Sequence, residues 1–367
     1  MRVLFLTRYA SNGASSRYRS FQYFPLLEQA GIECQVKPLF DELYLIHLYQ
    51  FGRAHVGDIF RAFLRRLAVL LTVRSYELVV IEYELIPYFP AILERWLCWL
   101  GVSYLVDYDD AIFHRYDAHR NKLVRIFLGQ KIAGVIRGAS VVTAGNYYVA
   151  NYARRSGASR VEIIPTVIDL QRYPLLPTKS SAGMPFVIGW IGSPTTAKYL
   201  QDIAPALAEV CAGGRGVVRL IGSGKVNLPD VPVEVVPWDE STELAELQKF
   251  DIGIMPLLDE PWERGKCGFK LIQYMACGLP VVASPVGENC QIVEHGVNGF
   301  LAGTPEQWEQ ALLTLLTDTN LRHRFGQTGR LKVEKHYCIQ VTGPKVSALL
   351  AASVSMGRIK RKDNSTV

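Results

Sequence analysis

Residues 262–302 read WERGKCGFKLIQYMACGLPVVASPVGENCQIVEHGVNGFLA, and this stretch decides how the rest of the chain is interpreted. Charged residues and glycines come first, and the segment from Phe269 to Cys277 then has the apolar spacing of a helix. Gly278 marks a turn, and residues 281–283 predict a buried strand. A loop, a helix start and a following strand suit a phosphate-bearing ligand, because unpaired backbone N–H groups and the positive end of the helix dipole both attract an anion.

Several residues of this stretch are candidates for holding such a ligand. Lys266 and Lys270 would add full positive charges near the start of the predicted helix. Gly268 and Phe269 form the turn into that helix and are expected to contact the ligand. An ordinary surface turn before an amphipathic helix is the alternative interpretation, since isolated loops of this kind often lack a ligand.

The same stretch resembles the donor-binding segment of the retaining GT-B glycosyltransferases often called family 4. In that family a helix with the pattern lEAMA.G.PVva is followed by a glycine loop and by Eiv..g.nG.lv. The resemblance implies a segment that holds a nucleotide diphosphate sugar. The matching positions in this chain are Met275, Ala276, Gly278, Pro280, Val281, Val282, Gly287, Ile292, Val293, Gly296, Asn298 and Gly299.

Two acidic positions of the family pattern are changed here. The family's paired glutamates fall on Gly265 and Gln273. Gln273 can still hydrogen-bond a ribose hydroxyl, because its amide has both a donor and an acceptor. Glu263 is the neighbouring acid that could take the place of the first glutamate. Recognition of the sugar is therefore where this chain departs from the resembled family.

A second glycine loop lies upstream, in GWIGSPTTAKYL at residues 189–200. It predicts a strand, a loop at Gly192 and the start of a helix. In the resembled family this loop supplies an arginine and a lysine to the diphosphate. Ser193 stands at the arginine position, whereas Lys198 matches the lysine. The lost bidentate phosphate contact could be replaced by Arg264, together with the two lysines of the first stretch.

Two more positions follow predicted strands of the same half. By the resemblance, Trp238 would stack near the nucleobase, although a tryptophan after a strand is equally compatible with a core position. Pro256 ends DIGIMPL, the strand that in the family ends beside the sugar. Helix N-termini with Lys198 and Lys270 as catalytic cations would stabilise the departing diphosphate. The resemblance therefore implies catalysis with no metal and no cofactor.

The N-terminal part predicts the first unit of a parallel α/β sheet. A strand at 3–7 is followed by a loop and by a helix at 17–29 with a kink or late start at Pro25. Ligands of such sheets bind outside the carboxyl ends of the strands. Gly13, Ser16 and Arg17 are therefore candidates for substrate binding, while a plain turn with a helix cap is the alternative.

Three aspartates follow another predicted strand in DYDDAIFHRY, residues 107–116. Asp109 is a candidate for binding the acceptor and Asp110 for catalysis. Adjacent carboxylates can bind a cation, orient a hydroxyl or act as a general base if burial raises a pKa. Helix capping and pairing with His114 or Arg115 is the alternative.

Length and composition favour a globular protein of two domains. Of its residues, 49% are hydrophobic and 20% are charged. The length of 367 residues is more than one typical domain core accommodates. Seven scattered cysteines without a CxxC pair predict buried free thiols. No apolar stretch is long enough for a membrane span, and the N-terminus reads as a strand rather than a signal peptide. A cytoplasmic protein is expected.

Two basic segments qualify that expectation. Residues 53–74 predict an amphipathic helix that can lie on an anionic membrane surface; a helix packed on the sheet with a solvated basic rim is the alternative. Residues 115–137 are also basic and favour a membrane-facing first domain on the inner face of the membrane. The first helix combines the apolar residues Ile59, Phe60, Phe63, Leu64, Leu67, Leu70 and Leu71 with Arg53, Arg61, Arg65, Arg66 and Arg74.

The predicted fold class is α/β, with two Rossmann-like domains facing across a cleft in the GT-B arrangement. The predicted parts are a first, acceptor-side domain (1–170), a linker (171–185), a nucleotide-sugar-binding domain (186–338), a helix (339–356) that packs back on the first domain, and a disordered basic tail (357–367). Strands are expected at 77–81, 103–106, 141–143, 161–164, 186–190, 217–221, 233–236, 251–257 and 281–283, and C-terminal helices at 305–317, 320–328, 330–336 and 340–355.

The predicted activity is transfer of a sugar, with retention, from a UDP- or GDP-linked donor to a hydroxyl of a glycan or a lipid-linked acceptor. Cell-surface polysaccharide synthesis is the expected setting, and no nucleic acid is expected as a partner. One alternative is a sugar-nucleotide epimerase on the same plan. Another is a non-catalytic nucleotide-sugar-binding or scaffold protein, which the changes at Ser193 and Gly265 would favour.

Overall fold

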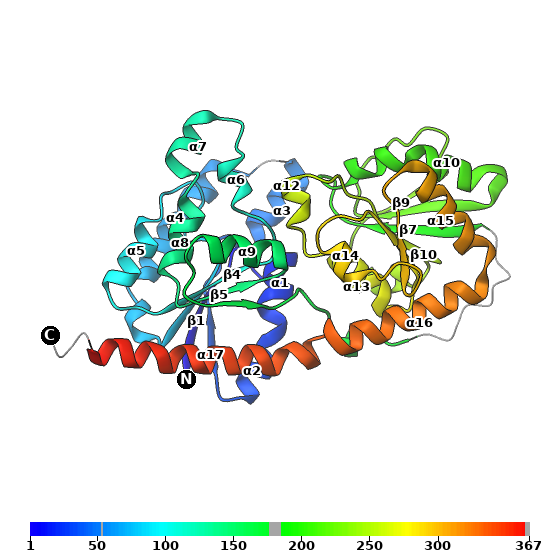
Figure 1. Ribbon diagram of the computed structural model, residues 1–367. Coiled ribbons are helices and arrows are strands. Elements are labelled where there is room, and N and C mark those ends of the chain that lie inside the picture. Colours follow the sequence, from blue (N-terminus) through cyan, green and yellow to red (C-terminus); the bar gives the residue numbers. More distant parts are fainter. Residues whose placement is uncertain (53, 176–184, 364–367) are drawn as a thin grey trace. The chain divides into compact units, whose positions relative to one another are not determined.

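The computed structural model describes residues 1–52, 54–175 and 185–363 (Figure 1). Its internal contacts divide the chain into two compact units. The first unit comprises Met1–Thr166, Gly265–Cys267 and the chain from Ile339 onwards, and the second comprises Val167–Arg264 and Gly268–Cys338. Each unit contains one six-stranded sheet, all of whose strand pairs are parallel. The predicted α/β class is therefore confirmed.

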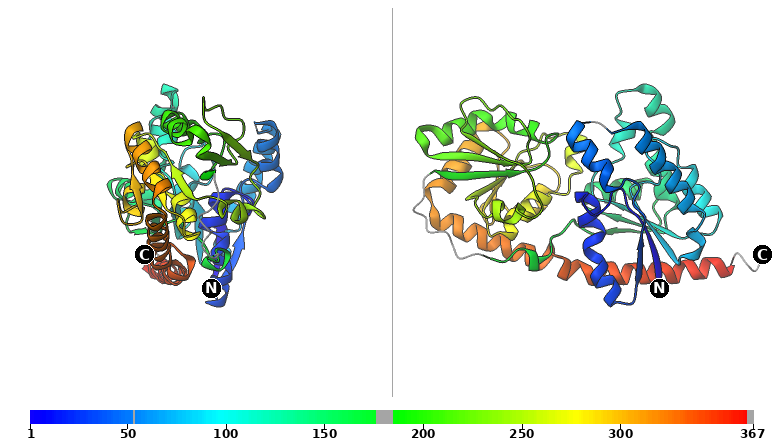
Figure 2. Two further views of the ribbon diagram at one scale, coloured as in Figure 1. Left: turned by 90° about the vertical axis from the view of Figure 1, so that its right-hand side faces the viewer. Right: turned by 180° about the vertical axis from the view of Figure 1, so that it is seen from behind.

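The sheet of the first unit has the strand order β2-β1-β3-β4-β5-β6. Strands β3 and β4 are buried along their whole length, as expected when helices cover both faces of a parallel sheet, and helices do so here (Figures 1 and 2). The edge strand β2 was not predicted. The strands are β1 (Arg2–Leu6), β2 (Glu33–Val36), β3 (Leu78–Glu82), β4 (Tyr104–Tyr108), β5 (Val141–Ala144) and β6 (Val161–Ile163).

The predicted helix at 17–29 is split in the structure. Helix α1 ends at Arg19, and α2 begins at Phe24 with Pro25 in its first turn. Proline is tolerated there because the first backbone N–H groups of a helix have no partner within the helix. The α-helices of this unit are α1 (Ala14–Arg19), α2 (Phe24–Gln29), α3 (Glu42–Phe51), α4 (Val56–Leu70), α5 (Ile92–Trp99), α6 (His114–Asp117), α7 (Lys122–Leu128), α8 (Lys131–Gly138), α9 (Tyr147–Arg155) and α17 (Ile339–Asp363).

Helix α17 packs against α2 and β3 of the first unit. It runs to Asp363, so the backbone is helical in most of the stretch that was predicted as a disordered tail. Residues 364–367 of that tail, residues 176–184 of the predicted linker and Arg53 lie outside the described residues.

The sheet of the second unit has the strand order β12-β11-β10-β7-β8-β9. Its edge strand β12 was not predicted either. The strands are β7 (Phe186–Ile191), β8 (Gly216–Ile221), β9 (Val233–Val236), β10 (Ile252–Met255), β11 (Val281–Ala283) and β12 (Gly299–Leu301). The α-helices are α10 (Ala204–Cys211), α11 (Glu243–Leu247), α12 (Pro261–Arg264), α13 (Phe269–Ala276), α14 (Asn289–Ile292), α15 (Pro305–Thr317) and α16 (Thr319–His336).

Helix α16 corrects the prediction of two helices at 320–328 and 330–336. Gly326 and Gly329 do not break it. An ideal Cβ at Gly326 would lie 1.9 Å from the Gly278 carbonyl oxygen, and one at Gly329 would lie 2.9 Å from Met275 Cγ. Glycine is therefore used here to let α16 pack closely against α13, and the apparent breaker residues mark a tight helix contact.

All seven cysteines are free thiols. Cys98 and Cys290 are exposed, so the expectation of burial is wrong for these two. Within the described part of the chain, no helix is long and apolar enough to cross a membrane.

Candidate functional site

The start of α13 in the second unit has the form of an anion-binding turn. Gly268 caps the helix with a φ of 67° and offers no side chain to it. An ideal Cβ at this position would also lie 2.3 Å from Ile292 Cδ1. Only glycine fits both restraints. The first backbone N–H groups of α13 therefore receive no side-chain cap from Gly268, and they are the groups that bind anions at helix starts.

Lys270 lies in the first turn of α13, beside the glycine loop that follows β7. Its ammonium is 5.0 Å from the centre of the Trp190 ring. An ideal Cβ at Gly192 would lie 2.6 Å from the buried Trp190 ring and 2.8 Å from Lys270 Cε, so glycine is needed for the loop to pass the ring. The backbone N–H of Ile191 donates to the Tyr274 hydroxyl at 3.0 Å, which fixes α13 against the end of β7. The structure thus brings the predicted residues Gly192 and Lys270 together.

The rest of this loop is more exposed. Ser193 is exposed, and its hydroxyl pairs with Thr195 at 2.9 Å. Lys198 is also exposed, with its ammonium 5.0 Å from the ring centre of Tyr199. Both residues therefore lie at the surface of the second unit, after the carboxyl end of β7.

Glu263 is placed by the same loop. The Tyr199 hydroxyl donates to its Oε1, and the carboxyl group is buried. Within the described residues, its other oxygen, Oε2, has no hydrogen-bond partner. A buried carboxylate oxygen without a donor is unfavourable. Glu263 is therefore a candidate acceptor for a hydroxyl of a bound ligand, the role considered for it from the sequence.

Trp238 and Gln273 meet through a residue that the sequence analysis missed. The Gln273 amide donates to Glu243 Oε1 at 2.8 Å, and the Trp238 indole N–H donates to Glu243 Oε2 at 2.6 Å. Tyr173 joins this group, because its hydroxyl accepts from the Gln273 amide at 3.2 Å. Gln273 and Glu243 are buried, but Trp238 is 40% exposed. Trp238 is therefore partly exposed beside a buried carboxylate, an arrangement suited to a base and its ribose.

The remaining predicted residues of this half have separate positions. Arg264 donates to both carboxylate oxygens of Asp259, at 2.6 and 3.1 Å, and this partner lowers the pKa of Asp259. Lys266 is half-buried in the segment 265–267, which groups with the first unit. Pro256 is buried directly after β10, and Phe269 is the first residue of α13.

In the first unit, the loop after β1 is held by a buried carboxylate. Ser16 donates to Glu82 Oε2 at 2.6 Å and accepts from the Tyr9 backbone N–H at 3.0 Å. Gly13 caps α1, and an ideal Cβ there would lie 2.3 Å from Tyr9 Cβ. Arg17 is buried, with its guanidinium 4.9 Å from the Tyr18 ring centre. In this structure Ser16 holds the loop, and Glu82, which burial gives a raised pKa, was missed.

The aspartates at the end of β4 and just after it have different partners from those considered. Arg19 donates to Asp107 at 2.5 and 2.9 Å. The Tyr83 hydroxyl donates to Asp109, and Tyr83 has a φ of 63°, a strained conformation for a residue with a side chain. The alternative pairing is not formed, because His114 pairs with Asp117 and Arg115 lies nearest to Glu84.

Asp109 is the most perturbed acid of this group. Burial, and then the neighbouring charge of Asp110, raise its pKa to about 7. An aspartate with such a pKa can exchange a proton near neutral pH. Among the described residues, no cluster of three or more His, Cys, Asp or Glu side chains could hold a metal ion.

Known proteins share both the sequence pattern and the fold. The family Glycosyl transferases group 1 matches residues 185–318. D-inositol 3-phosphate glycosyltransferase of Salinispora arenicola is 28% identical over 265 residues, covering 59% of this chain and 56% of that protein. N-acetyl-alpha-D-glucosaminyl L-malate synthase of Bacillus anthracis is 24% identical over 153 residues, covering 38% of each protein. The chain spans about half, or less, of the length of these curated relatives.

Solved structures decide the fold. Anabaena Alr3699/HepE in complex with UDP-glucose has a TM-score of 0.71 at 16% identity, over 96% of this chain and 100% of that chain. A glycosyltransferase from Rickettsia africae has a TM-score of 0.70 at 13% identity, over 96% and 98%. The resemblance to the GT-B glycosyltransferases is confirmed. Within this GT-B fold, the family match falls on the unit that contains Lys198, Lys270 and Gln273.

Proposed function

We propose that this GT-B protein transfers a sugar, with retention, from a UDP- or GDP-linked donor to a hydroxyl of a glycan or a lipid-linked acceptor. The observation that carries the proposal is the start of α13. There the helix N-terminus that Gly268 begins, the Gly192 loop and the Lys270 ammonium are adjacent. Backbone donors and a cation at one point suit a diphosphate, whose charge they neutralise.

The neighbouring groups supply the other donor contacts. The exposed face of Trp238 would stack on the base, while Glu243 and Gln273 would bond the ribose. Glu263 would accept from a hydroxyl of the sugar through its unpaired Oε2. UDP-glucose in the similar Anabaena structure supports a nucleotide sugar as the ligand of this fold.

The reaction then needs charge stabilisation more than a protein base. As the bond from the anomeric carbon to the diphosphate breaks, negative charge develops on the phosphate oxygens, where Lys270 and Lys198 stabilise it. The acceptor attacks from the same face, and a phosphate oxygen takes its proton. Asp109, Asp110, Gly13, Ser16 and Arg17 are proposed to bind on the acceptor side. No metal ion is required, because the lysines and helix dipole supply the positive charge.

We further propose that the protein works in the cytoplasm, at the inner face of a membrane, in cell-surface polysaccharide synthesis. Exposed leucines and arginines on α4 support contact with an anionic surface. Leu64 and Leu67 are exposed on this helix, as are Arg61 and Arg65. Both features are typical of helices that lie in a membrane interface.

Donor hydrolysis tests the activity. The purified chain is incubated with UDP- and GDP-sugars without acceptor, and release of the nucleoside diphosphate is followed with and without EDTA. We expect slow release from one donor class, unchanged by EDTA. Donor binding without any release, also after acceptor glycans are added, would favour the non-catalytic alternative that the changes at Ser193 and Gly265 suggest. Loss of release in EDTA would contradict a metal-independent reaction.

A further inference from the structure

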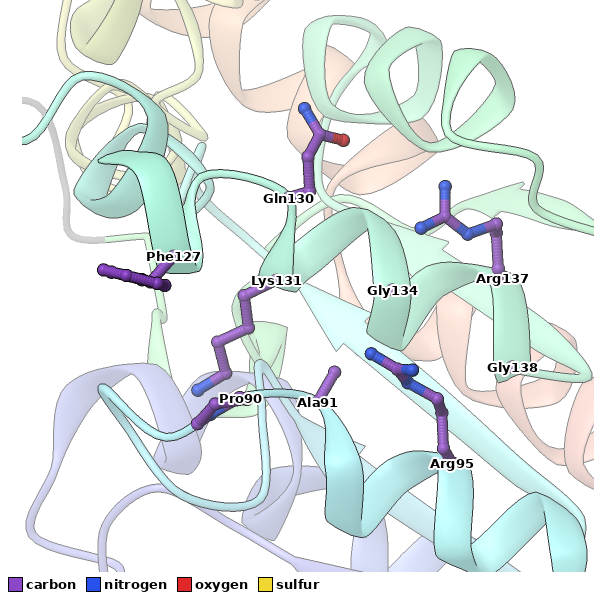
Figure 3. A pocket seen from close by; sticks show the side chains of 9 residues that line it. All are labelled: Pro90, Ala91, Arg95, Phe127, Gln130, Lys131, Gly134, Arg137 and Gly138. Carbon is purple, nitrogen blue, oxygen red and sulfur yellow. The ribbon is translucent and has the colours of Figure 1, made fainter. Parts of the chain in front are cut away.

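A hollow on the first unit, between α5, α7 and α8, combines positive charge with an apolar rim. Its volume is about 400 Å³, and its lining includes Arg95, Phe127, Gly134 and Arg137. Figure 3 shows the two arginines on one side of Gly134 and Phe127 on the opposite side. None of the described residues that line the hollow is acidic. It is separate from every residue assigned to the donor or the acceptor.

The two arginines are available to a ligand. Arg95 and Arg137 are both exposed, and within the described parts of the chain neither makes a hydrogen bond or an ion pair. Lys131 differs from them, because its ammonium donates to the Ile86 carbonyl at 2.6 Å and pairs with Glu84. The hollow therefore offers two guanidinium groups without a counter-charge, the groups that best bind a phosphate.

The helices that border the hollow carry large apolar side chains that are exposed. On α5, Ile92 and Trp99 share the helix face of Arg95 by their spacing, and Trp99 is 80% exposed. On α7, Leu123 and Phe127 share a face, and Phe127 is 76% exposed. Exposed tryptophan and phenylalanine beside unpaired arginines match a membrane interface, where apolar rings enter the acyl boundary and cations meet the headgroups.

We infer that this face docks on an anionic phospholipid bilayer, with a headgroup phosphate in the hollow between Arg95 and Arg137. The charge of the site and the apolar rim together favour a lipid over a free phosphate, since a soluble anion would leave the rings in water. Nothing in this inference requires the proposed transfer activity.

The test is co-sedimentation of the full chain with vesicles. One set is phosphatidylcholine alone, and the other contains equal parts of phosphatidylcholine and phosphatidylglycerol. We expect binding to the anionic set only. The double variant Arg95→Gln, Arg137→Gln should bind about 25-fold more weakly, taking about fivefold for each arginine near a charged surface. The matched control is Arg154→Gln, Arg155→Gln, which removes the same charge from exposed positions on α9.

Two further readings make the result decisive. Trp99→Ala should also weaken vesicle binding, although it changes no charge. Thermal stabilisation by nucleoside diphosphates should be unchanged in all these variants, which separates this site from the donor site. Equal loss in the Arg154, Arg155 control would overturn the inference. So would saturation of the site by glycerol 3-phosphate, which would indicate a free phosphate, or self-association through this face in sedimentation velocity, which would indicate a second copy.

Discussion

Helix α4 of the first unit and helix α13 of the second both have amphipathic sequences, but they bury different kinds of side chain. Helix α13 buries Leu271 and Ile272 against its unit and keeps Lys270 at its first turn. Helix α4 buries Arg66, which is 3% exposed, and leaves Leu64 and Leu67 in solvent. The apolar face predicted for α4 is thus divided, because Leu70 is buried and Ile59 packs on a small core cluster, whereas Leu64 and Leu67 are exposed.

The buried arginine explains part of this difference. Arg66 donates to the Thr7 carbonyl at 2.7 Å, at the end of β1. Within the described residues, its Nε and Nη1 have no hydrogen-bond partner, and burial lowers its pKa. Spacing therefore reveals which residues share a stripe of a helix, but it does not reveal which stripe the fold covers. The hydrogen bond from Arg66 to Thr7 therefore helps to determine which side of α4 is buried.

Removal of the lysine at the start of α13 should have the greatest effect on activity. Lys270→Ala should lower the rate of sugar transfer by about 10²–10³-fold, the usual loss when one group that stabilises developing charge is removed. The rate is measured with a saturating donor and compared with Lys249→Ala, a lysine of the same unit that pairs with Glu246. Similar rates in both variants would remove Lys270 from the mechanism.

The next effect compares the packing of the two helices. Leu271→Ala removes a fully buried side chain and should lower the free energy of unfolding by about 2–5 kcal/mol. Leu64→Ala removes a side chain that is 51% exposed, so the change should stay within about 0.5 kcal/mol. Urea midpoints of the two variants measure the difference. A loss at Leu64 as large as that at Leu271 would show that α4 is covered in solution.

A smaller effect depends on pH. Folding raises the pKa of Asp109 from 3.8 to about 7, so between these values the folded chain keeps a proton that the unfolded chain has released. Stability from this group is therefore full below pH 3.8, falls as the pH rises to about 7, and is constant above that. Urea midpoints at about pH 5 and about pH 8 should differ less in Asp109→Asn than in the unmodified chain.

Glu288 also contributes to the pH dependence of stability in this range. Burial raises its pKa to about 7 as well, so it contributes a slope of the same sign from the second unit. Asp109→Asn should remove part of the pH dependence, and Glu288→Gln should remove another part. If the urea midpoints of Asp109→Asn depend on pH as much as those of the unmodified chain, Asp109 is already ionised in the folded chain at pH 5, about one unit above its ordinary pKa.

The smallest effect tests the exposed side of α4. Leu64→Ala with Leu67→Ala should weaken binding to anionic vesicles severalfold, because apolar area at the interface contributes to partition. The comparison is Leu331→Ala, an exposed leucine of the second unit. Equal binding by the two sets of variants would remove α4 from the membrane contact.

The sequence predicted the α/β class and most central strands because buried parallel strands are short apolar runs after turn residues. It missed the edge strand β2, whose residues are mixed in polarity, and the edge strand β12, which has only three residues. It also read Gly329 as a helix break, although the glycine allows contact with Met275. Local pattern alone does not distinguish a glycine that ends a helix from one that packs it.

Site residues could be predicted from the sequence where they belong to one continuous motif. Gly192, Gly268 and Lys270 were named from their loops, and the structure brings Lys270 to the Gly192 loop. Glu243 was not named, because it is an ordinary acidic residue on a short helix and its partners, Trp238 and Gln273, come from other elements. Its link to them is visible only once the chain is folded.

We propose that the start of α13 holds a nucleoside diphosphate. The most direct test is a thermal-shift series of the full chain with UDP, GDP and ADP and their common sugar conjugates, since a ligand of the folded state raises the Tm by mass action. We expect UDP or GDP to raise the Tm selectively and Lys270→Ala to abolish the shift. A series with no shift for any nucleotide, under conditions where the chain is folded, would contradict it.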